Sequence, residues 1–144
     1  MKKHNTAAMR LMVIVIVSVM LMANSLKADA ALRYNNTVST TTSATVSSDG
    51  TVTIYFGYNG IPGVTSRGEI TTYIEKRILG IFWTRESIGL PNNQWEDLIY
   101  NYKYNSSHCH QFSSTGTYRV TVMYKIYGTG GDPDEITWQG TVTY

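Results

Sequence analysis

The chain has 144 residues, with 12 basic side chains, 10 acidic side chains and one cysteine. Residues 1–30 hold four of the basic side chains and one of the acidic ones, so residues 31–144 carry a formal charge of −1, which gives no basis for binding nucleic acid or an anionic membrane through net charge. A single cysteine excludes an internal disulfide, and this length is typical of one domain stabilised by its own core.

The first thirty residues have the pattern of a secretory signal peptide. Basic residues precede an uncharged run, Leu11–Ala23, which is shorter than the roughly 20 apolar residues that a membrane span needs. The small-x-small pattern Ala28-Asp29-Ala30 follows, so we predict cleavage after Ala30 and release into the extracellular space without a stable membrane anchor.

Residues 31–43 are predicted to be a flexible lead-in to the domain. The stretch Asn35–Ser43 consists of Asn, Thr and Ser with one valine and shows no apolar periodicity. The folded domain is therefore expected over residues 44–144.

Apolar residues alternate with polar ones through most of this domain, and Thr, Tyr and Gly are frequent, as is typical of antiparallel β-structure. Asp49-Gly50 and Leu79-Gly80 are predicted tight turns. The predicted strands are residues 44–47, 51–59, 69–78, 81–88, 95–105, 108–112, 117–127 and 136–144.

About seven or eight short strands of this kind fit an all-β fold, an antiparallel two-sheet sandwich in which each sheet buries one face. A small β-barrel is the alternative architecture.

The segment from Phe112 to Val122 carries a family resemblance. Tyr118 follows Gly116 by two residues and Phe112 by six, and it opens an alternating strand. This pattern resembles the tyrosine corner of immunoglobulin-like and fibronectin type III-like domains, and the resemblance implies that the Tyr118 hydroxyl binds upstream backbone while these three residues have structural roles.

The chain departs from the antibody type of this fold, since Val120 stands where the second cysteine would be and the strand over residues 69–78 has no central tryptophan. As a whole the chain is similar to small secreted proteins of Gram-positive bacteria. That resemblance implies secretion and a sandwich fold, and it implies no activity.

His108, Cys109 and His110 are residue types that bind zinc. On a strand, adjacent side chains point to opposite faces, so the two histidines share one face and the cysteine lies on the other. This alternation argues against a metal site and against a Cys–His nucleophile. Whether Cys109 is free or pairs between two chains is left open.

The acidic residues do not form a catalytic pattern. Asp132, Asp134 and Glu135 share a Gly/Pro-rich loop, for which ordinary turn chemistry is favoured over calcium binding. Glu96 and Asp97 are adjacent and so diverge on a strand, unlike the facing carboxylates of glycosidases. Because nucleophile-elbow, phosphate-loop and zinc-protease motifs are also missing, we expect neither enzymatic activity nor a cofactor.

Tyr100, Tyr102 and Tyr104 are in phase within the strand predicted over residues 95–105. If that face is exposed, the three rings form a ladder on which sugar rings could stack, and otherwise they line the core or cover a sheet face.

The segment Ile78-Leu79-Gly80-Ile81-Phe82-Trp83 is a second candidate contact. With Leu79-Gly80 as a hairpin tip, the predicted faces are Ile74, Ile78, Ile81 and Trp83 on one side and Tyr73, Arg77 and Phe82 on the other. One face would remain outside as an apolar and cationic patch, which marks an interface when it is large. Ordinary packing of these residues is favoured over an interface, since isolated apolar side chains on a surface are normal.

These observations predict a secreted, non-catalytic binding or adhesion module for a cell-envelope or carbohydrate ligand. The alternative is a secreted antimicrobial or membrane-active effector that uses the apolar hairpin tip through Phe82 and Trp83, and an enzyme is the minority hypothesis.

Overall fold

The alternation of apolar and polar residues produces eight β-strands in the computed structural model, which describes residues 34–144. The strands are β1 (Thr37–Val46), β2 (Thr51–Gly60), β3 (Thr65–Ile78), β4 (Phe82–Arg85), β5 (Gln94–Ile99), β6 (Lys103–Gln111), β7 (Thr117–Gly128) and β8 (Asp134–Thr143). One 3-10 turn, η1 (Pro91–Asn93), precedes β5. No helix in this part of the chain is long and apolar enough to cross a membrane. The predicted leader and its cleavage site lie outside the described residues.

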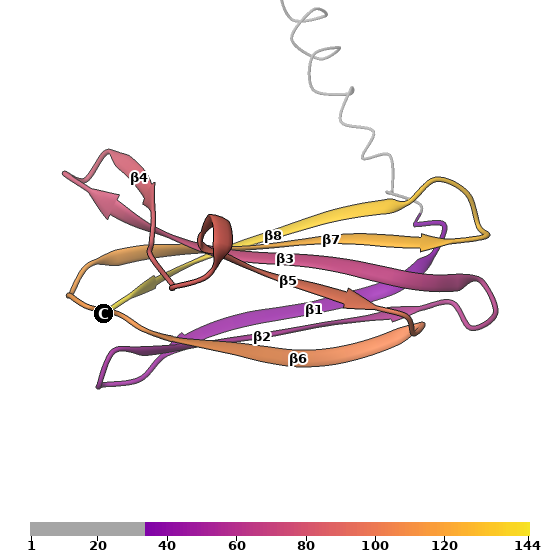
Figure 1. Ribbon diagram of the computed structural model, residues 1–144, viewed down its shortest axis with the longest axis horizontal. Coiled ribbons are helices and arrows are strands. Elements are labelled where there is room, and N and C mark those ends of the chain that lie inside the picture. Colours follow the sequence, from indigo (N-terminus) through magenta and orange to yellow (C-terminus); the bar gives the residue numbers. More distant parts are fainter. Residues whose placement is uncertain (1–33) are drawn as a thin grey trace, which may run out of the picture. The chain divides into compact units, whose positions relative to one another are not determined.

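The strands form two antiparallel sheets that face each other (Figure 1). One sheet has the order β1-β2-β6. The other has the order β4-β3-β7-β8, and β5 also pairs with β3, so β4 and β5 share one edge of that long strand. The two-sheet antiparallel sandwich predicted from the sequence is confirmed, and the two sheets are not closed into the alternative barrel.

The core lies between the two sheets and is built mainly by their central strands. The predicted phase of these strands is confirmed, because the residues that alternate in the sequence are the ones with almost no exposed surface. They are Val52, Ile54, Phe56 and Tyr58 of β2, Ile70 and Ile74 of β3, and Tyr118, Val120, Val122, Tyr124 and Ile126 of β7.

The first strand corrects the predicted domain boundary. β1 begins at Thr37, seven residues before Ala44, so residues 37–43 belong to a sheet and do not form a flexible lead-in. Asn36 is fully buried, and its backbone N–H donates to the Asp134 carboxylate at 2.8 Å. The side chain of Asn36 binds the carbonyl of Asp132 at 3.0 Å and the N–H of Gly130 at 3.1 Å, so the start of β1 is fixed to the β7–β8 loop.

The strand predicted over residues 95–105 is also corrected, because the chain leaves one sheet at Ile99 and enters the other at Lys103. The Tyr58 hydroxyl donates to the carbonyl of Asn101 at 2.6 Å and holds this crossing in place. From Lys103 to Gln111 the chain forms one strand, β6, which includes most of the separate short strand predicted over residues 108–112.

The predicted hydrogen bond of the tyrosine corner is confirmed. Tyr118 has no exposed surface, and its hydroxyl donates to the carbonyl of Ser114 at 2.6 Å. Its ring stacks on that of Phe112 with 3.7 Å between centroids, while the N–H of Gly116 donates to the carbonyl of Tyr144. Together these contacts fix the connection between β6 and β7.

Candidate functional site

The β3–β4 hairpin ends in a tight turn at the predicted Leu79-Gly80 tip. Both residues have positive φ values, 51° and 70°, and the N–H of Ile81 donates to the carbonyl of Ile78 at 3.1 Å. Positive φ at both central positions is the geometry of a type I′ turn, whose twist matches that of paired strands. Figure 1 shows this hairpin extending away from the other strands.

The faces of the hairpin differ from the prediction. Ile78 pairs with Phe82, and Arg77 pairs with Trp83, because Ile81 belongs to the loop and moves the register by one residue. A shift of one residue exchanges the faces of a strand. Phe82 therefore lies on the side of Ile78, and Trp83 lies on the outer face of the sheet beside Arg77.

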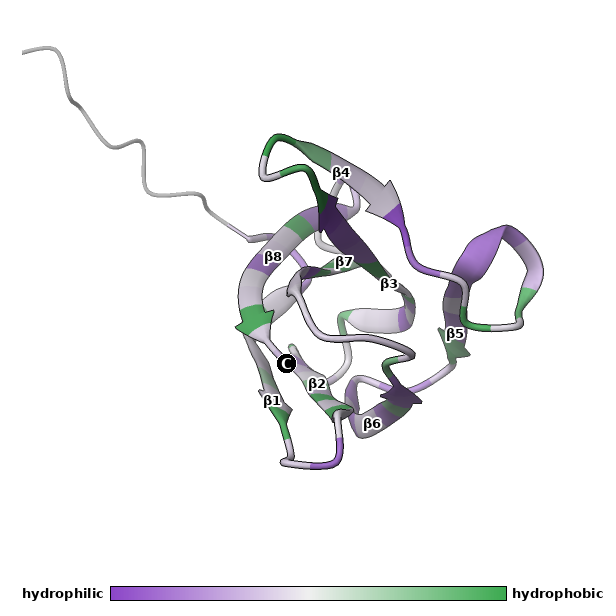
Figure 2. Ribbon diagram, turned by 90° about the vertical axis from the view of Figure 1, so that its left-hand side faces the viewer, coloured by the Kyte–Doolittle hydropathy of each residue, from purple (hydrophilic) through white to green (hydrophobic). Residues whose placement is uncertain are grey.

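Four large apolar side chains around this turn are exposed. The exposed fractions are 40% for Ile78, 85% for Leu79, 71% for Ile81 and 62% for Phe82. We call these four side chains the tip patch, and Figure 2 shows the apolar colouring of this hairpin end. Single exposed apolar residues are ordinary, but a continuous group at the end of a projecting hairpin is typical of a contact surface.

Arginine side chains surround the base of the tip patch. The Arg119 guanidinium lies 4.5 Å from the centre of the Trp83 ring, and Arg77 lies 5.8 Å from the same ring. Arg85 covers the Tyr73 ring at 3.5 Å. Arg77 and Arg85 are exposed, so the apolar end of the hairpin is bordered by positive charge.

The predicted ladder of three tyrosines is not formed. Tyr100 and Tyr102 lie in the crossing between the two sheets and are 75% and 45% exposed. Tyr104 lies on the inner side of β6, where its ring is 6.3 Å from that of Phe56. The three side chains therefore do not share one face, although Tyr100 and Tyr102 are both exposed to solvent.

The two histidines of β6 share the inner face, as alternation predicts, and Cys109 lies exposed on the outer face. The Nε2 atom of His108 is 2.8 Å from a carboxylate oxygen of Asp97, and its ring stacks on Trp95 at 4.9 Å. His110 lies 3.8 Å from Glu86. Each histidine thus has its own carboxylate, and these pairs connect β6 with the edge of the opposite sheet.

The neighbouring acidic residues also point to different partners. Asp97 points inward to His108, while Glu96 accepts a hydrogen bond from Gln94 on the outside, which confirms that neighbouring carboxylates diverge. In the acidic loop, Asp134 binds the start of β1, whereas Glu135 forms an ion pair with Lys125 at 2.9 Å. Among residues 34–144, no three His, Cys, Asp or Glu side chains are grouped so that they could hold a metal ion.

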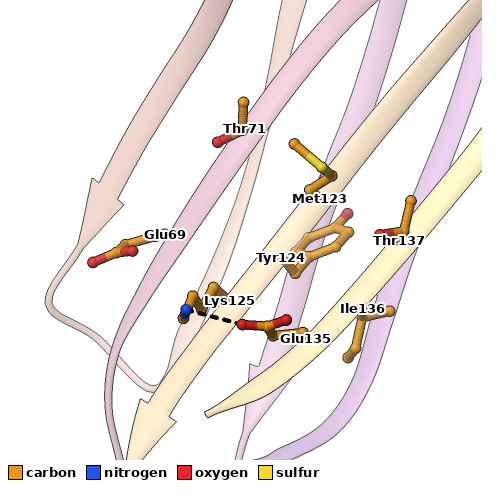
Figure 3. Close-up of a pocket in the computed structure, with 8 residues that line it drawn as sticks. All are labelled: Glu69, Thr71, Met123, Tyr124, Lys125, Glu135, Ile136 and Thr137. Atoms are coloured by element: carbon orange, nitrogen blue, oxygen red, sulfur yellow. Dashed lines mark ion pairs between the residues drawn. The ribbon is translucent and has the colours of Figure 1, made fainter.

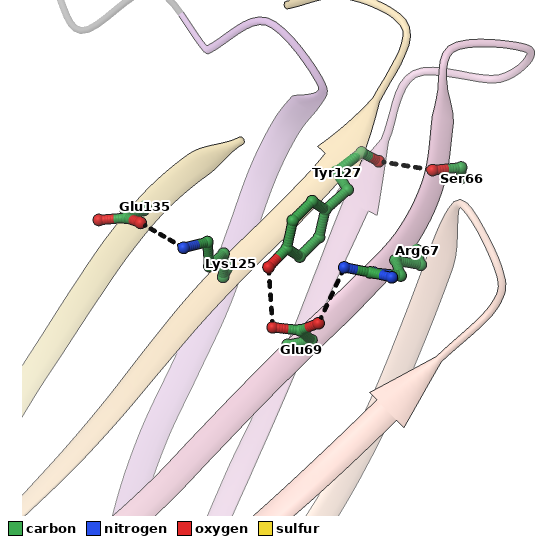
Figure 4. Close-up of polar contacts among 6 residues, drawn as sticks. All are labelled: Ser66, Arg67, Glu69, Lys125, Tyr127 and Glu135. Carbon is green, nitrogen blue, oxygen red and sulfur yellow. Dashed lines mark hydrogen bonds and ion pairs between the residues drawn. The ribbon is translucent and has the colours of Figure 1, made fainter. Parts of the chain in front are cut away.

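A shallow pocket of about 260 Å³ lies on the outer face of the five-stranded sheet, over β3, β7 and β8 (Figure 3). Glu69, Lys125 and Glu135 form one row of its lining, and the hydrogen bond and charge of Glu135 raise the pKa of Lys125. The neighbouring Tyr127 hydroxyl donates to Glu69 at 2.9 Å, and Arg67 forms an ion pair with the same carboxylate (Figure 4). Each of these charged side chains therefore has a partner of opposite charge on the same outer face.

The exposed Tyr55 is a residue that the sequence pattern did not single out. It lies on β2 but points away from the core, on the outer face of the three-stranded sheet, and it is 54% exposed. The available signal was its position out of phase with Ile54 and Phe56. Its surroundings could not be predicted, because Ser43, which pairs with it, lies in the part of β1 that was predicted to be a flexible lead-in.

No protein-family model matches this chain, and no curated protein matches it at a significant level of similarity.

Proposed function

We propose that this protein is an exported, non-catalytic binding module that attaches to the lipid surface of a cell envelope through the tip patch. The observation that carries the proposal is the exposure of Ile78, Leu79, Ile81 and Phe82 together at the end of one hairpin. Burying a side chain of this size contributes about 1.5–3 kcal/mol relative to leaving it in water.

The shape and charge of the hairpin favour a lipid interface as its partner. A tight hairpin tip places few backbone groups at the apolar end, and its apolar side chains can enter the boundary between headgroups and acyl chains. Trp83 and the exposed Arg77 and Arg85 lie behind the tip patch, where an aromatic ring and cations suit the headgroup level. Each arginine contributes about 1 kcal/mol near an anionic surface.

The domain as a whole does not add attraction to an anionic surface, since residues 31–144, with Arg77 and Arg85 included, carry a formal charge of −1. Attachment through one hairpin is therefore expected to be reversible and sensitive to salt. The same tip patch also supports the membrane-active effector as a second candidate, and the two functions differ in whether the bilayer is breached.

Vesicle sedimentation tests the attachment. The purified secreted chain is expected to sediment with vesicles of phosphatidylglycerol and phosphatidylcholine, less so at high salt. The double variant Leu79→Ser/Phe82→Ser should remain in the supernatant, while Leu98→Ser, which removes a 56% exposed leucine from β5, should sediment like the wild type. Equal sedimentation of the tip variant and the wild type would contradict the proposal. Release of a trapped dye from the vesicles would identify the effector.

We further propose that the sandwich is immunoglobulin-like. The sheet β1-β2-β6 corresponds to strands A, B and E of that fold, and β3, β7 and β8 correspond to C, F and G. The Tyr118 bond at the connection between β6 and β7 supports this correspondence, since the tyrosine corner lies between E and F.

Export is proposed from residues 1–30, with cleavage after Ala30. Amino-terminal sequencing of protein from the culture medium should begin at Ala31. Secreted material that begins upstream of Leu26 would contradict this cleavage site.

A further inference from the structure

The outer face of the three-stranded sheet differs in charge from the outer face of the five-stranded sheet. We call it the neutral face, because Lys103 at one end of β6 is its only charged residue. The strand register places these residues on it: Ser39, Thr41, Ser43, Thr45, Thr51, Thr53, Tyr55, Gly57, Asn59, Lys103, Asn105, Ser107, Cys109 and Gln111.

We propose that the neutral face binds an uncharged polysaccharide chain, with the ring of Tyr55 stacking on a sugar. This goes beyond the proposed lipid attachment, since it concerns a different surface and does not depend on the tip patch.

Tyr55 is placed as a stacking platform at the middle of this face. It lies on the central strand, with Ser43 across from it on β1 and Ser107 across from it on β6. Gly57 follows it two residues along the same face. These small neighbours leave the ring accessible, and a tyrosine ring combines a flat apolar surface with a polar hydroxyl, as a sugar ring requires.

Because Gly57 has no side chain, a polar side chain occupies the space beside the Tyr55 ring. A Cβ atom at this position would collide with the side chain of Asn105, which shows that this amide lies over the glycine. The hydrogen-bonding groups of Asn105 are therefore in the row next to Tyr55.

The remainder of the neutral face presents hydroxyl and amide groups in regular rows. Along a strand, the side chains on one face repeat about every 6.6–6.8 Å, and neighbouring strands are about 4.8 Å apart. Hydroxyl groups both donate and accept hydrogen bonds, so each can pair with a sugar hydroxyl as the donor or as the acceptor. Surfaces composed of Tyr, Ser, Asn and Gly are adaptable in recognition, because the ring gives rigid area and the small residues give hydrogen bonds.

The near absence of charged side chains on the neutral face favours an uncharged ligand. Anionic polymers bind through Lys and Arg, and the neutral face has only Lys103 at its edge. The outer face of the other sheet is the opposite, with ion pairs such as Arg119–Glu75 and Lys125–Glu135. A stable protein partner is less suited, because its interface needs an apolar centre, and Tyr55 is the only large side chain with apolar surface at the middle of this face.

Affinity electrophoresis tests the proposal with the purified secreted chain. Native gels contain one soluble polysaccharide each: mixed-linkage β-glucan, mannan, starch or, as the anionic control, polygalacturonate. Insoluble cellulose and chitin are used in parallel sedimentation. Retention by at least one neutral polysaccharide and none by polygalacturonate is the expected result.

Variants connect retention to the neutral face. Tyr55→Ala should lower the affinity about tenfold, since it removes the stacking surface, and Tyr55→Phe should keep most of it. Ser107→Glu keeps the ring but adds a charge beside it and should also weaken retention. Tyr102→Ala, which removes another exposed ring, and Leu79→Ser in the tip patch should both behave like the wild type.

Three results would overturn the proposal: no retention by any neutral polysaccharide, retention by polygalacturonate alone, or equal retention of Tyr55→Ala and the wild type. Because the tip variant serves as a control here, a failure of glycan binding leaves lipid attachment unaffected, and the reverse also holds.

Discussion

At the scale of single residues, Tyr118 shows how one hydroxyl can stabilise a chain reversal. Its hydroxyl donates to the carbonyl of Ser114 inside the fold, and its ring lies against Phe112. Tyr118→Phe keeps the burial and removes only the bond, leaving a carbonyl without its partner. We expect a loss of about 1–3 kcal/mol in the free energy of unfolding, measured by denaturant melts.

Tyr127→Phe is the matched control on the same strand. Tyr127 lies on the outer face, where its hydroxyl donates to the half-exposed Glu69. Water can replace this bond, so the loss should be about 0.5 kcal/mol or less. A loss at Tyr127 equal to or larger than that at Tyr118 would contradict the structural role assigned to the corner.

At the scale of elements, alternation predicted β2, β3 and β7 well because each buries one face along most of its length. The first part of β1, residues 37–43, escaped prediction because its partly buried positions are filled by Thr, which gives no hydropathy signal, whereas residues 44–47 were predicted as a strand. The crossing after Ile99 escaped because the tyrosines on both sides continue the same period. Its position is set by a long-range bond from Tyr58, which no local pattern contains.

The anchor of β1 gives a prediction for this element. Asn36→Ala removes the buried amide that binds Asp132 and Gly130, and these two partners lose their contact. We expect a loss of about 1–3 kcal/mol in the free energy of unfolding, together with faster amide hydrogen exchange in β1. Asn59→Ala, on an exposed site of β2, should change both measurements little. Slow, unchanged exchange in β1 of the Asn36 variant would show that the anchor is unnecessary.

At the scale of the whole molecule, the charges of the domain are concentrated on one sheet. The register explains this distribution, since Glu69, Glu75, Arg119 and Lys125 all occupy outward positions of β3 and β7. The sequence predicted the sandwich and the hairpin turn at Leu79-Gly80. It could not predict the neutral face, because β6 is distant in sequence from β1 and β2, and residues 37–43 of β1 were predicted to be a flexible lead-in.

The domain is expected to fold without a metal or a disulfide. Its single cysteine, Cys109, is exposed, and His108 and His110 are each paired with a different carboxylate. Thermal melts in the presence of a chelator or a reductant should therefore give the same Tm as melts without them. A fall of several degrees in either case would reveal a metal or a cross-link that stabilises the fold.

The buried tyrosines predict that the molecule loses stability in alkali. Burial raises the pKa of Tyr58, and the electrostatic effect of Tyr104 raises it further. Burial also raises the pKa of Tyr124. Below pH 10, roughly, tyrosine keeps its proton in both states. As the pH rises further, the unfolded chain loses these protons first, so the native state binds more protons and the free energy of unfolding falls until the pH passes the native pKa values.

Denaturant melts between about pH 9 and pH 11.5 measure this effect, which is at most about 1.4 kcal/mol per pH unit for each tyrosine. Tyr58→Phe and Tyr124→Phe lose the bonds to the carbonyls of Asn101 and Thr41 and should be less stable near pH 7. Each should nevertheless show a shallower alkaline decline than the wild type, whereas Tyr102→Phe, which removes an exposed hydroxyl, should show the same decline. Parallel curves for all four proteins would mean that ionisation of these two core tyrosines does not limit stability in alkali.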